Sequence, residues 1–488
     1  MSASLKKNTI YNMIYQVVVI IAPLITSPYL SRVMGAESVG VYSYTYSIAN
    51  YFFLFSMLGV NNYGNRAIAQ AKFNRKNLSE TFWQIYYLQL ICTAMAGTAY
   101  FFYCLFLAKG FYQRMLLCQG IYVLSAATDI NWFAFGMECF KQTTIRNIAV
   151  KLLTIVLIFA FVKAPGDVVK YTLIVTCGVV VGLLVMWPLV AKNTDFQKPD
   201  IHKILYHFKP NIILFIPYLA TSIYNLDRIM IGRIEGNEAV GYYNYAMNIL
   251  SIPQGLSTAV CTVFMPRVSS LLKNGNRMKA IDLLDKSVQY MNVLNIALCF
   301  GLMSVAQTFI PFYLGEEYSR TARLLSILSV DIIISGMSTI LRMVYLIPAE
   351  KDRTYTSSII IGAIVNAIGN YLAIPKLGAE GACVATLVAN GSILVVQVVS
   401  SWNELPYGKW LRKMLPFFLC GIAEYCVVNF FAKVNFLHGI VQIAVQITAG
   451  GIIYVLLAIA IIVLLYKENI IRDIVGKTNP IIGDKTNG

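Results

Sequence analysis

Apolar runs of about 20 residues follow one another along most of this 488-residue chain, and no other feature constrains its fold as strongly. Hydrocarbon offers no water to the backbone of a lipid-exposed strand or loop, so each run is predicted to cross the membrane as an α-helix. The runs lie near residues 10–33, 39–63, 81–107, 112–137, 145–163, 169–191, 210–232, 239–264, 288–312, 323–347, 355–374, 380–401, 414–433 and 440–466. We therefore predict an all-α polytopic membrane protein with about 14 transmembrane helices.

Composition agrees with this class, since 58% of the residues are hydrophobic and 13% are charged. Soluble domains carry roughly 25% charged residues. The net charge of +16 does not indicate a nucleic-acid partner, because Lys and Arg lie in short segments between the apolar runs rather than in one patch. An N-terminus on the inside places most of the 39 Lys and Arg residues in the cytoplasm, as the positive-inside rule requires. Both termini are then predicted to be cytoplasmic.

Residues 32–46 and 233–247 match each other at a fixed offset of 201, with seven identical positions. The identical pairs are Arg32/Arg233, Gly35/Gly236, Glu37/Glu238, Val39/Val240, Gly40/Gly241, Tyr42/Tyr243 and Tyr44/Tyr245. The same offset pairs Arg66 with Arg267. The chain is therefore an internal duplication, and repeats of this kind are common in transporters.

The offset covers six predicted helices, and an even number returns the chain to the same side of the membrane. The two copies are thus expected to be parallel repeats about an axis along the membrane normal, with a central cleft between them. We predict a six-helix bundle over residues 1–200 and a second over 201–402, followed by two further transmembrane helices and a cytoplasmic tail over 403–488. Rocking of one bundle against the other would give alternating access.

Several short motifs in this order resemble the polysaccharide flippases of the multidrug/oligosaccharidyl-lipid/polysaccharide exporter superfamily. The motifs are the duplicated G-x-E-x-V-G-x-Y-x-Y hairpin, Asp129 to Glu138 with Arg146-Asn147, Leu226-Asp227-Arg228, Pro266-Arg267, and Gly378-Ala379-Glu380-Gly381-Ala382. One departure is that Ile130 and Asn131 separate the family's aspartate–tryptophan pair. The resemblance covers residues 1 to about 400, where the duplication ends.

The resemblance implies a flippase that moves an undecaprenyl-diphosphate-linked oligosaccharide from the cytoplasmic to the outer leaflet, for surface polysaccharide assembly. It implies the bacterial inner membrane as the location, and membrane lipid, a polysaccharide polymerase and chain-length machinery as candidate partners. No cofactor, metal site or catalytic residue is expected. The alternative is a small-molecule or drug antiporter on the same fold, since membership of a fold does not decide the substrate.

Ionisable side chains inside membrane spans are costly, so each is a candidate functional residue. Arginine suits a diphosphate because its planar guanidinium binds phosphate oxygens in pairs and stays charged. The candidates for substrate binding in the cavity are Arg32, Arg66, Asp129, Asp227, Arg228, Arg233, Arg267 and Arg342. The candidates for ion coupling are Asp129, Asp331 and Glu424.

Structural roles compete with these assignments. Arg32 and Arg233 each precede a glutamate by five residues, which fits a hairpin salt bridge or turn as well as a cavity mouth. Arg66 and Arg267 fit positive-inside anchoring as well as diphosphate capture. The tyrosines of the first hairpin, Tyr42, Tyr44 and Tyr46, are expected in an interfacial aromatic belt. Glu424 is also consistent with a locally hydrogen-bonded acid.

A membrane enzyme is the competing class of function. The three histidines are scattered, and the chain has neither an H-E-x-x-H nor a G-x-S-x-G motif. Gly476-Lys477-Thr478 lacks the preceding glycine that a phosphate-binding loop requires. We therefore expect a transporter and not an enzyme, driven either by an ion gradient or by the gradient of its own substrate.

Overall fold

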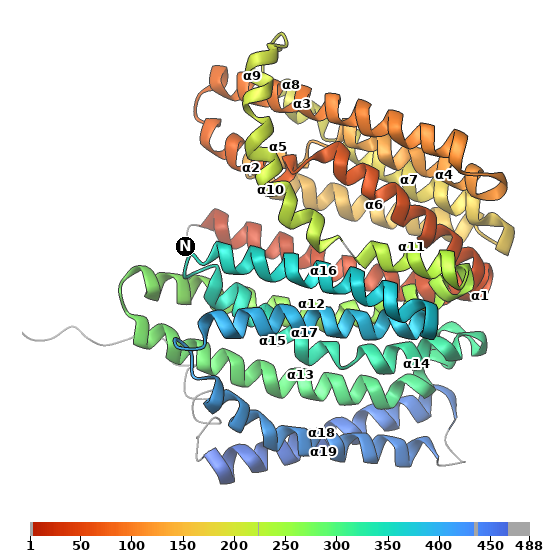
Figure 1. The fold of residues 1–488 in the computed structure, drawn as a ribbon, viewed down its shortest axis with the longest axis vertical. Helices are drawn as coiled ribbons and strands as arrows, with labels where there is room; N and C mark the ends of the chain where they lie inside the picture. Colours follow the sequence, from red (N-terminus) through yellow and green to blue (C-terminus); the bar gives the residue numbers. More distant parts are fainter. Residues whose placement is uncertain (1–2, 223, 434–437, 467–488) are drawn as a thin grey trace, which may run out of the picture. The chain divides into compact units, whose positions relative to one another are not determined.

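A computed structural model describes residues 3–222, 224–433 and 438–466 of the chain (Figure 1). Within these ranges the fold is helical and contains no β-strand. Nine of the helices described are long and apolar enough to cross a membrane, or ten if the pair Glu316–Leu328 and Asp331–Leu346 is one span. The all-α polytopic class is therefore confirmed. The figure of about 14 helices stays a prediction, and the predicted tail after residue 466 lies outside the residues described.

The part of the chain that the structure describes divides into two compact units, and the first consists of residues 3–222, 224–252, 310–328 and 351–397. Its helices are α1 (Ala3–Met57), α2 (Val60–Ala71), α3 (Arg75–Phe102), α4 (Gly110–Ser125), α5 (Asn131–Gly136), α6 (Phe140–Phe161), α7 (Val168–Leu184), α8 (Trp187–Asn193), α9 (Ile201–Tyr206), α10 (Phe208–Thr221), α11 (Tyr224–Ile234), the first part of α12 (Asn237–Lys273), α14 (Ser319–Leu328), α16 (Asp352–Leu377) and most of α17 (Ala379–Ser401). In this unit α1 packs against α3, α4, α6 and α11.

Of the residues described, the second unit consists of 253–309, 329–350, 398–433 and 438–466. It contains the remainder of α12, most of α13 (Arg277–Leu314), α15 (Asp331–Ile340) with the π-helical turn Leu341–Leu346, α18 (Tyr407–Ala432) and α19 (Gly439–Tyr466). Figure 1 shows α18 and α19, in blue, lying side by side. The Tyr454 hydroxyl on α19 donates to the Val293 carbonyl on α13 at 2.6 Å, which ties α19 to the unit's core.

Helix α1 carries the first duplicated hairpin. Gly35 has φ 72° and ψ 170°, so two helical arms meet there, and they correspond to the predicted spans 10–33 and 39–63. Its counterpart Gly236, with φ 111°, stands between α11 and α12. Both backbones occupy the positive-φ region, which only glycine adopts without strain. The shared conformation explains why glycine recurs at this position of the repeat.

Candidate functional site

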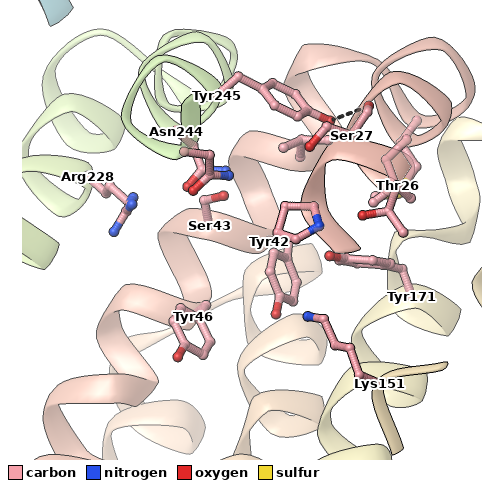
Figure 2. Close-up of a pocket in the computed structure, with 15 residues that line it drawn as sticks. Thr26, Ser27, Tyr42, Ser43, Tyr46, Lys151, Tyr171, Arg228, Asn244 and Tyr245 are labelled. Atoms are coloured by element: carbon pink, nitrogen blue, oxygen red, sulfur yellow. Dashed lines mark hydrogen bonds between the residues drawn. The ribbon is translucent and has the colours of Figure 1, made fainter. Parts of the chain in front are cut away.

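The first unit contains a cavity of about 270 Å³ beside the Gly35 bend (Figure 2). Both arms of α1 reach it, together with α6, α7, α11 and α12. Its polar lining residues are Thr26, Ser27, Tyr42, Ser43, Tyr46, Lys151, Tyr171, Arg228, Asn244, Tyr245 and Asn248. Its apolar lining residues are Pro23, Leu30, Met34 and Val39. The bend in α1 is what brings Ser27 on one arm opposite Tyr42 on the other.

Three tyrosines form an aromatic wall of this cavity. The ring of Tyr42 stacks on that of Tyr46, with centroids 5.9 Å apart, and meets the edge of Tyr171 at 4.7 Å. Tyr42 and Tyr46 occupy one strip because they lie four residues apart on a helix. Tyr42 and Tyr46 therefore line the cavity, and the expectation that they also belong to an interfacial belt stays a prediction.

The cavity contains two cations. Arg228 on α11, one of the predicted substrate-binding residues, lines this cavity, and its role in binding stays a prediction. Lys151 on α6 was not predicted, although it is the single charged residue between Ile148 and Phe161 and meets the same criterion of an ionisable group inside a span. In Figure 2 the Lys151 amine points toward Tyr42 and Tyr171, whereas Arg228 enters from another side.

Asp227 precedes Arg228 but does not line this cavity, because its side chain is fully buried. Its carboxylate accepts hydrogen bonds from Tyr243 at 2.7 Å, Asn370 at 2.5 Å and Thr386 at 3.4 Å. These donors come from α12, α16 and α17. The two charged residues of the Leu-Asp-Arg stretch therefore differ in their surroundings. The aspartate joins α11 to α12, α16 and α17, and the arginine faces the cavity.

The motif from Asp129 to Glu138 forms a break in a helix. Helix α4 ends in the 3₁₀ turn Ala126–Thr128, Asp129 is extended, and α5 begins at Asn131. The Asp129 carboxylate accepts the backbone N–H of Asn131, the first residue of α5, at 2.9 Å and so satisfies one of the unpaired donors at the start of this helix. Asp129 is buried and does not line the cavity of Figure 2.

Side chains from α3 and α8 satisfy the carbonyls that this break exposes. The Gln89 amide donates to the carbonyls of Ala126 at 2.5 Å and Asp129 at 2.8 Å. The Tyr86 hydroxyl donates to the Ala127 carbonyl, and the Trp187 indole donates to the Thr128 carbonyl, each at 3.1 Å. The Trp132 indole in turn donates to the amide oxygen of Gln89 at 2.9 Å. Irregular backbone at membrane depth requires such internal partners. The motif therefore builds a stable broken helix.

Arg146, the other part of the same motif, is also buried. Its guanidinium donates to the Asn131 side chain at 2.9 Å and to the Gly182 carbonyl at 3.2 Å. It thus fastens the start of α5 to α7 through α6.

The paired hairpin arginines lie elsewhere. Arg32 is exposed and donates to the Phe312 carbonyl at 2.7 Å. Arg233 is exposed beside Tyr44 and Tyr103. Neither forms an ion pair with the glutamate five residues on among the residues described. Arg66 on α2 is exposed as well. None of the three lines the cavity of Figure 2, and their roles in substrate binding stay predictions.

The remaining candidates belong to the second unit. Asp331 is buried and accepts the Gln254 amide at 2.8 Å, whereas Arg267 on α12 is exposed. Arg342 is half-buried in the π-helical turn after α15. Glu424 on α18 is buried against Gly301 of α13 and Gly450 of α19. Their proposed functions in binding or ion coupling stay predictions.

The fold and these motifs agree with comparisons to known proteins. A family described as "Polysaccharide biosynthesis protein" matches residues 5–272, more than half of the chain, and the chain belongs to this family. The Escherichia coli (strain K12) protein named "Putative O-antigen transporter" is 25% identical over 332 residues, covering 67% of this chain and 79% of its own length. "Lipopolysaccharide biosynthesis protein WzxC" of the same strain is 21% identical over 210 residues, which is 42% of this chain and 41% of the relative.

Solved structures show the same fold. The lipid II flippase MurJ, in an inward closed conformation, superimposes with a TM-score of 0.73 at 15% identity, covering 95% of this chain and 99% of that one. A multidrug resistance transporter of the MATE family gives a TM-score of 0.59 at 14% identity, and the match covers 80% of this chain and 97% of that one. The predicted resemblance is confirmed: the chain is a membrane transporter of the polysaccharide flippase class and not an enzyme.

Proposed function

We propose that this protein moves a lipid-diphosphate-linked oligosaccharide from the cytoplasmic to the outer leaflet of the bacterial inner membrane. The observation that carries the proposal is the cavity in which Lys151 and Arg228 face a wall of tyrosines. A diphosphate needs cations, and sugar rings suit aromatic faces flanked by hydroxyl and amide groups. The names of the relatives, an O-antigen transporter and a lipopolysaccharide biosynthesis protein, support a glycan substrate.

The size of the cavity limits what it can hold. About 270 Å³ is below the roughly 300–1,000 Å³ of pockets that enclose a drug-sized ligand. The cavity therefore accommodates part of the head group, such as the diphosphate with its adjoining sugar, and not a complete lipid-linked oligosaccharide. An undecaprenyl chain would remain in the membrane.

Transport by alternating access completes the proposal. In it, six-helix bundles at residues 1–200 and 201–402 move about a central cleft, the segment 403–488 adds two helices and a tail, and both termini are cytoplasmic. Asp129, Asp331 and Glu424 are the proposed residues for ion coupling. A polysaccharide polymerase and chain-length machinery are the proposed partners that use the translocated unit.

A liposome assay tests this function. The purified chain is reconstituted with a fluorophore-labelled lipid-diphosphate disaccharide, and dithionite, which does not cross the membrane, quenches label in the outer leaflet. We expect the protein to convert the protected inner pool into a quenchable one within minutes. Arg228→Gln should abolish this transfer, whereas Lys141→Gln, an exposed lysine outside the cavity, should not.

The same liposomes separate the alternative function. Transport of a cationic dye without any transfer of the glycolipid would favour a drug antiporter and contradict the proposal. Repeating the assay with and without a proton or sodium gradient decides whether an ion drives the transfer. A rate that is independent of both gradients would leave the substrate's own gradient as the driving force.

A further inference from the structure

The cavity in the first unit has an unbalanced charge. Lys151 and Arg228 line it, and none of its lining residues is an aspartate or a glutamate. Two cations in a confined site repel each other and are costly to remove from water unless anions compensate them. The lining therefore indicates an anionic ligand rather than a neutral one.

The partners of the two cations support this conclusion. Lys151 has no hydrogen-bond or ion-pair partner within the described part of the chain. Arg228 donates from Nη1 to the Asn225 side chain at 3.1 Å and has no other hydrogen-bond or ion-pair partner among the residues described. Both side chains therefore keep donors available for a ligand.

The adjacent carboxylate of Asp227 is hydrogen-bonded to groups other than Arg228. Both oxygens of Asp227 are engaged by buried neutral donors, Tyr243 and Asn370, and Asp227 does not line the cavity. No ion pair joins Asp227 to Arg228 in the described residues. The arginine is thus held in place by one amide and left open for an anion.

The two cations also reach the cavity from different helices. Lys151 comes from α6 and Arg228 from α11, and in Figure 2 Tyr42 lies between them. The guanidinium binds phosphate oxygens in pairs through its fork of donors, and the ammonium is a compact point charge that pairs with a second anionic group of the ligand, such as a carboxylate. Beside Lys151 stands the Tyr42–Tyr171 pair, whose rings offer a surface for a sugar.

We propose that Lys151 recognises the carboxylate of an acidic sugar in the glycan head group, while Arg228 holds the diphosphate. This inference rests on the proposed function and narrows its substrate class to repeat units that contain a uronic acid close to the lipid diphosphate. Asn244 and Asn248 on α12 supply amides for the hydroxyl groups of the same sugar.

A binding experiment with two matched compounds tests the proposal. The full chain in lipid nanodiscs is titrated with two farnesyl-diphosphate-linked disaccharides, which differ only in carrying glucuronate or glucose as the sugar attached to the diphosphate. We expect the wild type to bind the glucuronate compound about tenfold more tightly, as one charge-assisted hydrogen bond would provide. Lys151→Gln should remove this preference, because it should weaken binding of the glucuronate compound about tenfold more than binding of the glucose compound.

Two further variants make the result specific. Arg228→Gln should weaken both compounds by a similar factor and keep the preference for glucuronate. Lys141→Gln, which removes a charge from the exposed start of the same helix α6, should change neither affinity. Thermal unfolding of each variant in detergent verifies that it is folded.

Three outcomes would overturn the inference. Equal affinity of the wild type for both compounds would show that no carboxylate is recognised. Equal weakening of both by Lys151→Gln would assign the lysine to the diphosphate instead. Binding of neither compound by the wild type would contradict the proposed function itself, and with it the inference that depends on it.

Discussion

Gly40 and Gly241, equivalent residues of the duplication, each pack against the backbone of the other hairpin. A Cβ atom on Gly40 would lie 1.7 Å from the carbonyl oxygen of Asn237, and one on Gly241 would lie 2.1 Å from that of Ala36. Ala36 and Asn237 are themselves 201 residues apart, so the contact is reciprocal. Reciprocity of this kind is the mark of a twofold relation between two surfaces.

We expect Gly40→Ala and Gly241→Ala each to destabilise the protein by about 2 kcal/mol, because the added methyl group would overlap a carbonyl that cannot move without its helix. Unfolding midpoints in detergent would measure the effect. Gly391→Ala is the matched control, since no atom lies within 4 Å of its added Cβ in helix α17 and alanine favours helix. Equal midpoints for all three variants would refute a close contact between the hairpins.

The broken helix depends on Gln89, which holds two carbonyls and the Trp132 indole at once. Gln89→Leu would leave these groups buried without partners, at about 1–3 kcal/mol each, and should lower stability by roughly 3 kcal/mol or more. Trp132→Phe removes only one of the bonds and should cost less. Thr98→Val, on the exposed face of the same helix α3, should be nearly neutral. If Gln89→Leu were as mild as Thr98→Val, the break would not need these caps.

The aromatic wall makes a prediction about sugar binding. Tyr42→Leu should weaken binding of a farnesyl-diphosphate-linked disaccharide by about tenfold, because a ring face is lost, whereas Tyr42→Phe keeps the face and should change it by less than about threefold. Titration in nanodiscs measures both, and Tyr425→Leu on the exposed surface of α18 is the control. An equal loss for the leucine and phenylalanine variants would assign the role to the hydroxyl instead of the ring.

His207, between α9 and α10, should make stability depend on pH. Its Nδ1 lies 2.7 Å from the Tyr63 hydroxyl, and its Nε2 lies 3.0 Å from the amide oxygen of Gln84, to which it donates. In the neutral ring Nδ1 accepts the Tyr63 hydroxyl proton. Burial lowers the pKa of His207 below its usual 6.5. The unfolded chain therefore binds the proton more readily than the folded chain. The contribution of His207 to the free energy of unfolding is fully present above pH 6.5 and is lost as the pH drops below that value.

The measurement is the unfolding midpoint from pH 7.5 to pH 5. The wild type should lose stability across this window, and His207→Gln should flatten that part of the profile. His202→Gln is the control, because His202 is exposed one turn earlier on α9. Asp195, whose pKa the hydrogen bonds from Arg75 lower, adds a loss only at more acidic pH. Parallel profiles for wild type and His207→Gln would show that protonation of His207 is not the cause of the pH dependence.

Much of the fold follows from sequence patterns that are local. Runs of apolar residues of spanning length permit only helices in a membrane, and this requirement holds whatever the neighbouring helices do. The duplication was visible for a similar reason: the hairpin glycines Gly35 and Gly236 adopt positive φ, and Gly40 and Gly241 touch backbone, so other residues are excluded at these four positions. The class of protein could therefore be predicted from the residues alone.

The site depended on tertiary structure, because residues with the same pattern point to different places. Asp227 and Arg228 are neighbours, yet one is buried in a hydrogen-bond network and the other lines the cavity. Tyr42 faces the cavity while its repeat partner Tyr243 bonds Asp227, and the second copy contributes Tyr245 instead. Successive side chains of an α-helix leave its axis in directions about 100° apart. Which of these directions faces a cavity depends on how the neighbouring helices pack.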